Sequence, residues 1–266
     1  MVIIDAHTHL PSKPNPRTFF FRLTLEELIG DMNENGIDRS VTMTSPPRDT
    51  RLKVTQKEND WIANCIKKYP KRLIGLGFTN VFTDNPPSIG EYWSSTGADM
   101  GAKEVERCIK ELGMKGIKMH GYVCPIYPTA LTKILQKCVE LKVPLIEIHS
   151  GFHQITSLPE RIAFIANQYP ELTFYMNHMG GPHGELHAIS VAKHTPNLVL
   201  GTSACDKWAI RYAVKQLGAH RVLWASDNYC HAVSVEFEKL RSAGLTKQEF
   251  ELVAGENVAR ILGSST

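Results

Sequence analysis

The stretch IDAHTHL, residues 4–10, carries two histidines, His7 and His9, at the end of an apolar run that begins at Val2. Side chains two positions apart lie on the same face of a β-strand, so both imidazoles are expected to point the same way. In a closed barrel of strands, two imidazoles near the carboxyl end of one strand can reach a single metal ion. Taken alone, the motif fits equally well with two hydrogen-bonded polar residues at a strand end.

The rest of the chain alternates between short β-rich apolar runs and helical runs. Stop signals such as Pro70 and Pro170 follow two of the helical runs. The expected strands are residues 2–7, 39–43, 72–78, 116–119, 143–149, 172–178, 198–202 and 221–225. The expected helices are residues 25–33, 56–69, 103–112, 130–141, 160–169, 185–194, 207–217 and 235–242.

Eight strands that alternate with eight helices predict an α/β fold of the (β/α)₈ TIM-barrel type. The length of 266 residues agrees with the roughly 250 residues usual for this fold, and no linker or repeat divides the chain. We therefore expect one domain over residues 1–266, with its active site at the carboxyl ends of the strands. A doubly wound open sheet is the alternative, but no GxGxxG motif follows the first strand.

The composition argues against several classes of function. The net charge is +3 and no block of lysines and arginines occurs, so no nucleic-acid partner is expected. The six cysteines are scattered without a CxxC pair, which argues against a zinc ribbon or a disulfide framework. No secretory leader and no apolar run of the roughly 18 residues that span a bilayer are visible. The expected location is therefore the cytoplasm, without a membrane partner.

Three more polar residues stand at the ends of expected strands. His149 follows PLIEI, His178 follows TFYMN, and Asp227 follows VLWAS. A barrel would bring them to the same rim as the two histidines of the first strand. Imidazole and carboxylate ligands with one open position suit catalytic zinc, which lowers the pKa of bound water to about 7. Asp227 could then also accept the proton of that water as a general base.

The chain resembles the metal-dependent amidohydrolase superfamily, and most of all its amidohydrolase 2 branch, also called aminocarboxymuconate-semialdehyde decarboxylase-like. The matching segments are DAHTH at 5–9, GIKMH at 116–120, IHSG at 148–151, NHMGG at 177–181, ASD at 225–227 and GENVARILG at 255–263. The resemblance implies one divalent ion, usually zinc with manganese as an alternative. Its implied ligands are His7, His9, His149 and Asp227. The implied catalytic residues are Asp227 and His178. His178 would face the substrate and polarise a carbonyl or position water. A homodimer is a further expectation from the resemblance.

Lys118 allows two interpretations. In binuclear members of the superfamily, a lysine at this point is carboxylated and bridges two ions, and His178 would then be a ligand of the second ion. The alternative is an ammonium group paired with an inward carboxylate such as Glu147, or with the carboxylate of a substrate. A single ion is the preferred interpretation. Lys118 and His120 share a strand face and are predicted to contact the substrate.

Two reactions suit this set of residues. One is hydrolysis of an ester, lactone or amide by metal-activated water, and the other is non-oxidative decarboxylation of a small unsaturated or aromatic carboxylic acid. A barrel that merely binds metal is disfavoured, because the set includes a general base. The short chain and the complete HTH motif favour the hydrolase. A decarboxylase would need cations for its anionic substrate, for which Lys118, Arg17, Arg22 and Arg48 are candidates.

Overall fold

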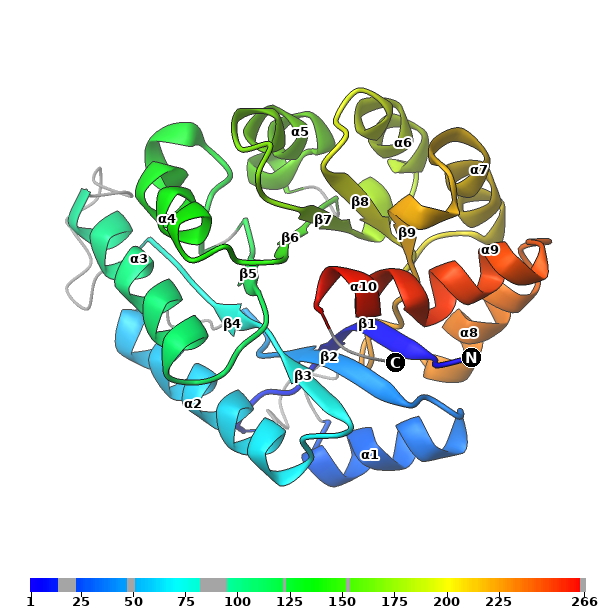
Figure 1. Cartoon of the computed structure of the whole chain (residues 1–266), viewed down its shortest axis with the longest axis horizontal. Helices are drawn as coiled ribbons and strands as arrows, with labels where there is room; N and C mark the ends of the chain where they lie inside the picture. Colours follow the sequence, from blue (N-terminus) through cyan, green and yellow to red (C-terminus); the bar gives the residue numbers. More distant parts are fainter. Residues whose placement is uncertain (14–22, 47–50, 82–94, 122, 152–153, 264–266) are drawn as a thin grey trace.

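The computed structural model describes residues 1–13, 23–46, 51–81, 95–121, 123–151 and 154–263, and Figure 1 shows parallel strands inside a ring of helices. The strands are β1 (Ile4–His9), β2 (Arg39–Met43), β3 (Leu73–Gly75), β4 (Gly77–Phe78), β5 (Ile117–Met119), β6 (Ile146–His149), β7 (Phe174–Asn177), β8 (Leu198–Gly201) and β9 (Val222–Leu223). The helices are α1 (Leu25–Glu34), α2 (Leu52–Lys68), α3 (Ser95–Lys110), α4 (Pro128–Glu140), α5 (Pro159–Gln168), α6 (Glu185–Lys193), α7 (Lys207–Leu217), α8 (Val233–Arg241), α9 (Lys247–Glu251) and α10 (Asn257–Ile261).

The strands follow one another around the ring in the order of the sequence. Parallel pairing joins β1, β2 and β3, and likewise β4 through β9. Between β3 and β4 stands a single residue, Leu76, whose N–H donates to Thr42 O of β2 at 3.0 Å. The next residue, Gly77, donates to Gly116 O on the other side at 2.9 Å. β3 and β4 are therefore one strand position, the third of eight in the described part of the chain.

Backbone hydrogen bonds between β1 and the end of the last strand close the ring. Ala6 N–H donates to Trp224 O at 3.0 Å, and Asp227 N–H donates to His7 O at 3.0 Å. Thr8 and Asn228 form a parallel bridge. Eight parallel positions, each followed by a helix, make the (β/α)₈ TIM barrel that the sequence predicts. In this order β6 is the fifth position, so it lies across the barrel from β1.

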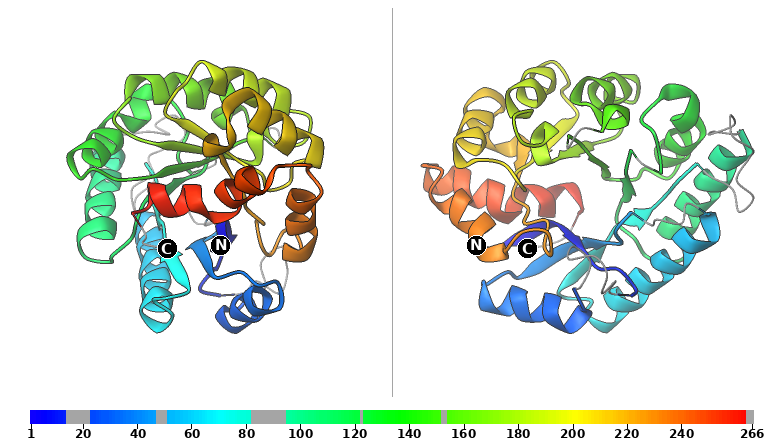
Figure 2. Two further views of the ribbon diagram at one scale, coloured as in Figure 1. Left: turned by 45° about the vertical axis from the view of Figure 1, so that its right-hand side comes forward. Right: turned by 180° about the vertical axis from the view of Figure 1, so that it is seen from behind.

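The C-terminal segment covers the end of the barrel where β1 begins. A small apolar cluster joins strand residues such as Val41 and Val199 to Val258 of α10 and to Leu262, which follows it. Figure 1 shows α10 crossing in front of β1, and the view from behind in Figure 2 shows the opposite end. The carboxyl ends of the strands, where barrel enzymes place their sites, lie at the end that α10 does not cover.

The predicted strands and helices are present, and most of their ends shift by a few residues. Helix α3 begins at Ser95, eight residues before its predicted start, because STGADMGA gives no apolar periodicity to mark it. The helices α9 and α10 were not predicted. Arg17, Arg22 and Arg48, the candidate cations for an anionic substrate, lie outside the described residues. In the described part of the chain, no helix is both long and apolar enough to cross a membrane.

Replacing Gly255 tests the packing of the C-terminal segment on β1. A Cβ at this position would stand 2.2 Å from the backbone oxygen of Val2, so one of the two segments must shift. Overpacking of this kind costs about 1–3 kcal/mol, and we expect Gly255→Ala to lower the melting temperature by several degrees. Gly30→Ala on α1 is the control, because no atom lies within 4 Å of its added Cβ. Equal melting temperatures for the two variants would contradict this packing.

Candidate metal centre

Three of the four predicted ligands lie close together at the carboxyl end of β1. Nε2 of His7 lies 3.0 Å from Nε2 of His9 and 3.1 Å from Oδ1 of Asp227. Nε2 of His9 lies 3.5 Å from the same oxygen. All three residues are buried. Donor atoms about 2.1 Å from one tetrahedral ion are roughly 3.4 Å apart, so this group has the spacing of a ligand set.

His178 and His149 extend the group into a cluster of imidazoles. His7, His178 and Asp227 offer ligand atoms that all lie within 4.8 Å of one another, so they form a group that can hold a metal ion. The ring centroid of His149 lies 4.7 Å from that of His178 and 4.2 Å from that of His120. His149 as the fourth ligand stays a prediction. His178 is the alternative, because it belongs to the group that can hold a metal ion.

The backbone at two of these residues has an unusual conformation. Asp227 has φ of 56° and His178 has φ of 64°, both in the left-handed region. A non-glycine residue there costs roughly 1–3 kcal/mol, and such residues gather at functional sites. Both residues stand where a strand ends and the chain turns. Their strained backbone has an energetic cost, so we infer that the placement of these two side chains serves the site.

Hydrogen bonding fixes the proton position of two rings. The Nδ1 of His9 lies 3.1 Å from the carbonyl oxygen of Thr44, which can only accept, so Nδ1 carries the hydrogen and Nε2 keeps a lone pair. Ser203 Oγ donates to Asn177 Oδ1 at 2.8 Å and therefore accepts from His178 Nδ1 at 2.9 Å. His178 Nε2 is then an acceptor too. Nδ2 of Asn177 lies 3.2 Å from this nitrogen. The predicted role of His178 toward a substrate stays a prediction.

Asp5 connects the strand that carries His7 to the segment that carries Asp227. Its carboxylate accepts from Ser226 N at 2.9 Å, from Ser226 Oγ at 2.5 Å and from His7 N at 3.1 Å. Burial raises the pKa of Asp5 to about 6, against the lowering effect of these hydrogen bonds. The sequence did not predict that Thr44 contacts His9, or that Asn177 and Ser203 contact His178. The polar pair Thr202 and Ser203 after β8 was the available signal for Ser203.

The charges of the site suit a cation. Burial lowers the pKa of both His9 and His178 to about 3, so these rings are neutral near pH 7. Burial opposes ionisation of Asp227, but the contact with His7 and the charges of the neighbouring imidazoles outweigh it and lower its pKa. Neutral imidazoles and an ionised carboxylate are the states that bind a metal ion. Burial also acts to lower the pKa of His7, but the charge of Glu147 and the contacts with Asp227 and Glu147 outweigh it and raise that pKa. The described residues include three buried carboxylates at the site, and Lys118 is the one buried lysine or arginine among them. A divalent cation would balance this excess of negative charge.

The structure pairs Lys118 with Glu147. Lys118 Nζ donates to Glu147 Oε1 at 2.8 Å, which is the ion pair with an inward carboxylate that the sequence allowed. His120 is buried, with its Nε2 3.4 Å from Gln154 Nε2. Contact of Lys118 or His120 with a substrate stays a prediction.

Comparison with known proteins decides the family. The family model described as amidohydrolase matches residues 4–264. The chain belongs to the amidohydrolase family. An uncharacterised TIM-barrel protein from Bordetella bronchiseptica is 16% identical with a TM-score of 0.78, and the match covers 99% of each chain. The 5-carboxyvanillate decarboxylase of Sphingomonas paucimobilis is 15% identical with a TM-score of 0.75, again over 99% of each chain. A dihydroxybenzoic acid decarboxylase from Polaromonas, solved with manganese and 2-nitroresorcinol, is 16% identical with a TM-score of 0.75 and covers 98% of this chain and 97% of its own.

These comparisons contradict the prediction of a hydrolase. Solved structures similar to this amidohydrolase chain are mostly decarboxylases of aromatic acids. The argument from length also fails, because the match covers 99% of the Sphingomonas decarboxylase as well as 99% of this chain. The HTH motif misled for a physical reason: two imidazoles on one strand bind an ion in either reaction.

Added metal should stabilise the protein through this group of residues. We expect Mn²⁺ or Zn²⁺ to raise the melting temperature of chelator-treated protein, since a ligand at a hundred times its Kd adds about 2.7 kcal/mol. His9→Ala should remove most of that rise. His187→Ala is the control, because this histidine is exposed and bonded to Glu160 outside the cluster. A full rise in the His9→Ala protein would exclude His9 as a ligand.

Proposed function

We propose that this amidohydrolase chain is a metal-dependent, non-oxidative decarboxylase of a small aromatic carboxylic acid. The observation that carries the proposal is the buried group of His7, His9 and Asp227 at the strand ends of a barrel. Similar barrels over nearly the whole chain include aromatic-acid decarboxylases, two of them with manganese. Nitrogen and carboxylate donors together suit either zinc or manganese.

The residues would divide the work as follows. His7, His9 and Asp227 would hold the ion, with His149 or His178 as a further ligand. The ion, when bound, would supply positive charge for the oxygens of an anionic substrate. In the reaction, the bond between the ring and the carboxylate breaks, carbon dioxide leaves, and the ring carbon retains the electron pair and takes up a proton.

A substrate panel tests the proposal. We expect manganese-loaded protein to release carbon dioxide from at least one hydroxybenzoate, and Asp227→Asn to lower kcat/KM at least about a hundredfold, because it removes a charged ligand. His187→Ala should match the wild type. Release of acid from an ester or lactone, with no carbon dioxide from any hydroxybenzoate, would contradict a decarboxylase.

Metal content per chain tests the single-ion arrangement. Because the Lys118 ammonium is paired with Glu147, we expect it to stay free of carboxylation and the site to hold one ion. Elemental mass spectrometry on protein purified without chelator or histidine tag gives the count, and intact-mass measurement detects an added carboxyl group. Two ions together with that added mass would contradict the arrangement.

A further inference from the structure

A buried ion pair stands in the middle of the barrel, below the imidazole cluster. Lys118 of β5 and Glu147 of β6 are direct partners in the register of the two strands, and both side chains are fully buried. Taking two charges out of water is costly, and apolar residues of similar volume often serve stability as well or better. Stability alone therefore does not account for the pair.

The oxygen of Glu147 that accepts from Lys118 also contacts Nδ1 of His7. His7 lies on β1, the position opposite β6, so the carboxylate reaches across the barrel to meet it. The other oxygen, Oε2, has no hydrogen-bond partner in the part of the chain that the structure describes. Both contacts thus depend on a single atom, Oε1, whose position Lys118 fixes.

This contact determines how His7 can bind a metal ion. Oε1 carries negative charge beside Nδ1, which favours the hydrogen of His7 on that nitrogen and leaves Nε2 toward His9 and Asp227. The contact is an ion-pair contact without the alignment of a hydrogen bond, because Nδ1 is among the buried atoms that lack a hydrogen-bond partner in the described residues. His9 differs in this respect, since its Nδ1 donates to a neutral backbone carbonyl.

We propose that Lys118 and Glu147 form a positioning element for the metal centre, in which Glu147 orients His7 and Lys118 holds the carboxylate in place and balances its charge. The inference rests on the proposed metal centre and is independent of which aromatic acid is the substrate. It gives Lys118 a structural task apart from the predicted contact with substrate.

Affinity for Mn²⁺ alone tests this inference, measured by the electron paramagnetic resonance signal of free Mn²⁺ and by calorimetry. The variant Lys118→Met/Glu147→Met removes both charges together and leaves apolar side chains of similar length. We expect its Kd for Mn²⁺ to rise about 10–100-fold, the usual effect of losing a partner of a ligating histidine. Glu147→Gln keeps an oxygen acceptor without the charge, so a smaller rise of several-fold is expected.

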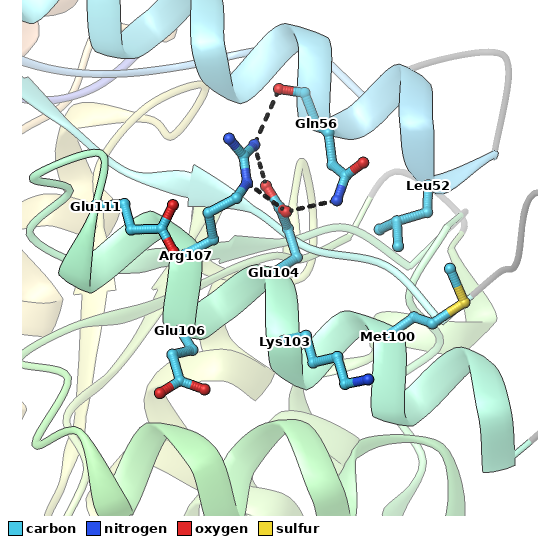
Figure 3. Close-up of a pocket in the computed structure, with 8 residues that line it drawn as sticks. All are labelled: Leu52, Gln56, Met100, Lys103, Glu104, Glu106, Arg107 and Glu111. Atoms are coloured by element: carbon cyan, nitrogen blue, oxygen red, sulfur yellow. Dashed lines mark hydrogen bonds and ion pairs between the residues drawn. The ribbon is translucent and has the colours of Figure 1, made fainter.

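Glu104 provides a matched control. It is a buried carboxylate of α3 paired with Arg107, and Figure 3 shows it beside a cavity of about 440 Å³ lined by α2 and α3 residues. Gln56 Nε2 donates to it at 3.1 Å. Glu104→Gln removes a buried charge away from the metal centre. It should lower the melting temperature and leave the Kd for Mn²⁺ at the wild-type value.

The outcomes separate the two proposals. Wild-type protein that does not bind Mn²⁺ would overturn the metal centre itself. Wild-type binding together with an unchanged Kd in the double variant would overturn only the positioning role. If the double variant does not fold, Glu147→Gln decides: a Kd within twofold of the wild type overturns the inference. An equal loss of affinity in Glu104→Gln would show a general effect of instability and would also overturn it.

Discussion

The closure of the barrel between its first and last strands is the constraint on which the site depends. Asp227 donates its backbone N–H to His7 O, so two residues 220 positions apart in sequence become neighbours. The carboxylate of Asp5 strengthens the same seam through Ser226. Without these bonds, the donor atoms of His7 and Asp227 would not lie close enough together to bind one ion. The metal centre is thus a product of ring closure, and the strain at Asp227 is part of what closure imposes.

Burial then sets the chemistry of the side chains that closure brings together. Removal from water keeps the imidazoles of His9 and His178 neutral, while contacts with the histidines keep Asp227 ionised, and both states are those of metal ligands. Partners outside the group fix each ring: a backbone carbonyl for His9, a hydroxyl for His178 and a carboxylate for His7. Three different acceptors therefore serve one purpose, which is to direct the second nitrogen of each ring.

The sequence predicted the barrel well because strand interiors and strand ends carry local signals. Apolar runs mark β6 and β7, and polar residues after them mark the rim. The contact of Glu147 with His7 carries no such signal, since it joins opposite strands and depends on barrel diameter and side-chain length. Register is another such property: β1 shifts register between Asp5 and Thr8, so strict alternation does not describe the strand that carries the histidines. Left-handed backbone at His178 was not predicted either, because the moderate enrichment of histidine in this region does not single out one position.

The error over the reaction has a related cause. The sequence shows a metal ligand set as residue types at strand ends, and the same set can hold an ion for hydrolysis or for decarboxylation. The surroundings of these ligands are much harder to predict. Ser203, which follows β8, contacts Nδ1 of His178 at 2.9 Å, and Nδ2 of Asn177 lies 3.2 Å from its Nε2. Ser203 is 25 residues from His178 in sequence, so the segment NHMGG does not encode this contact. Differences between the two reactions would lie in such surroundings, which depend on tertiary structure.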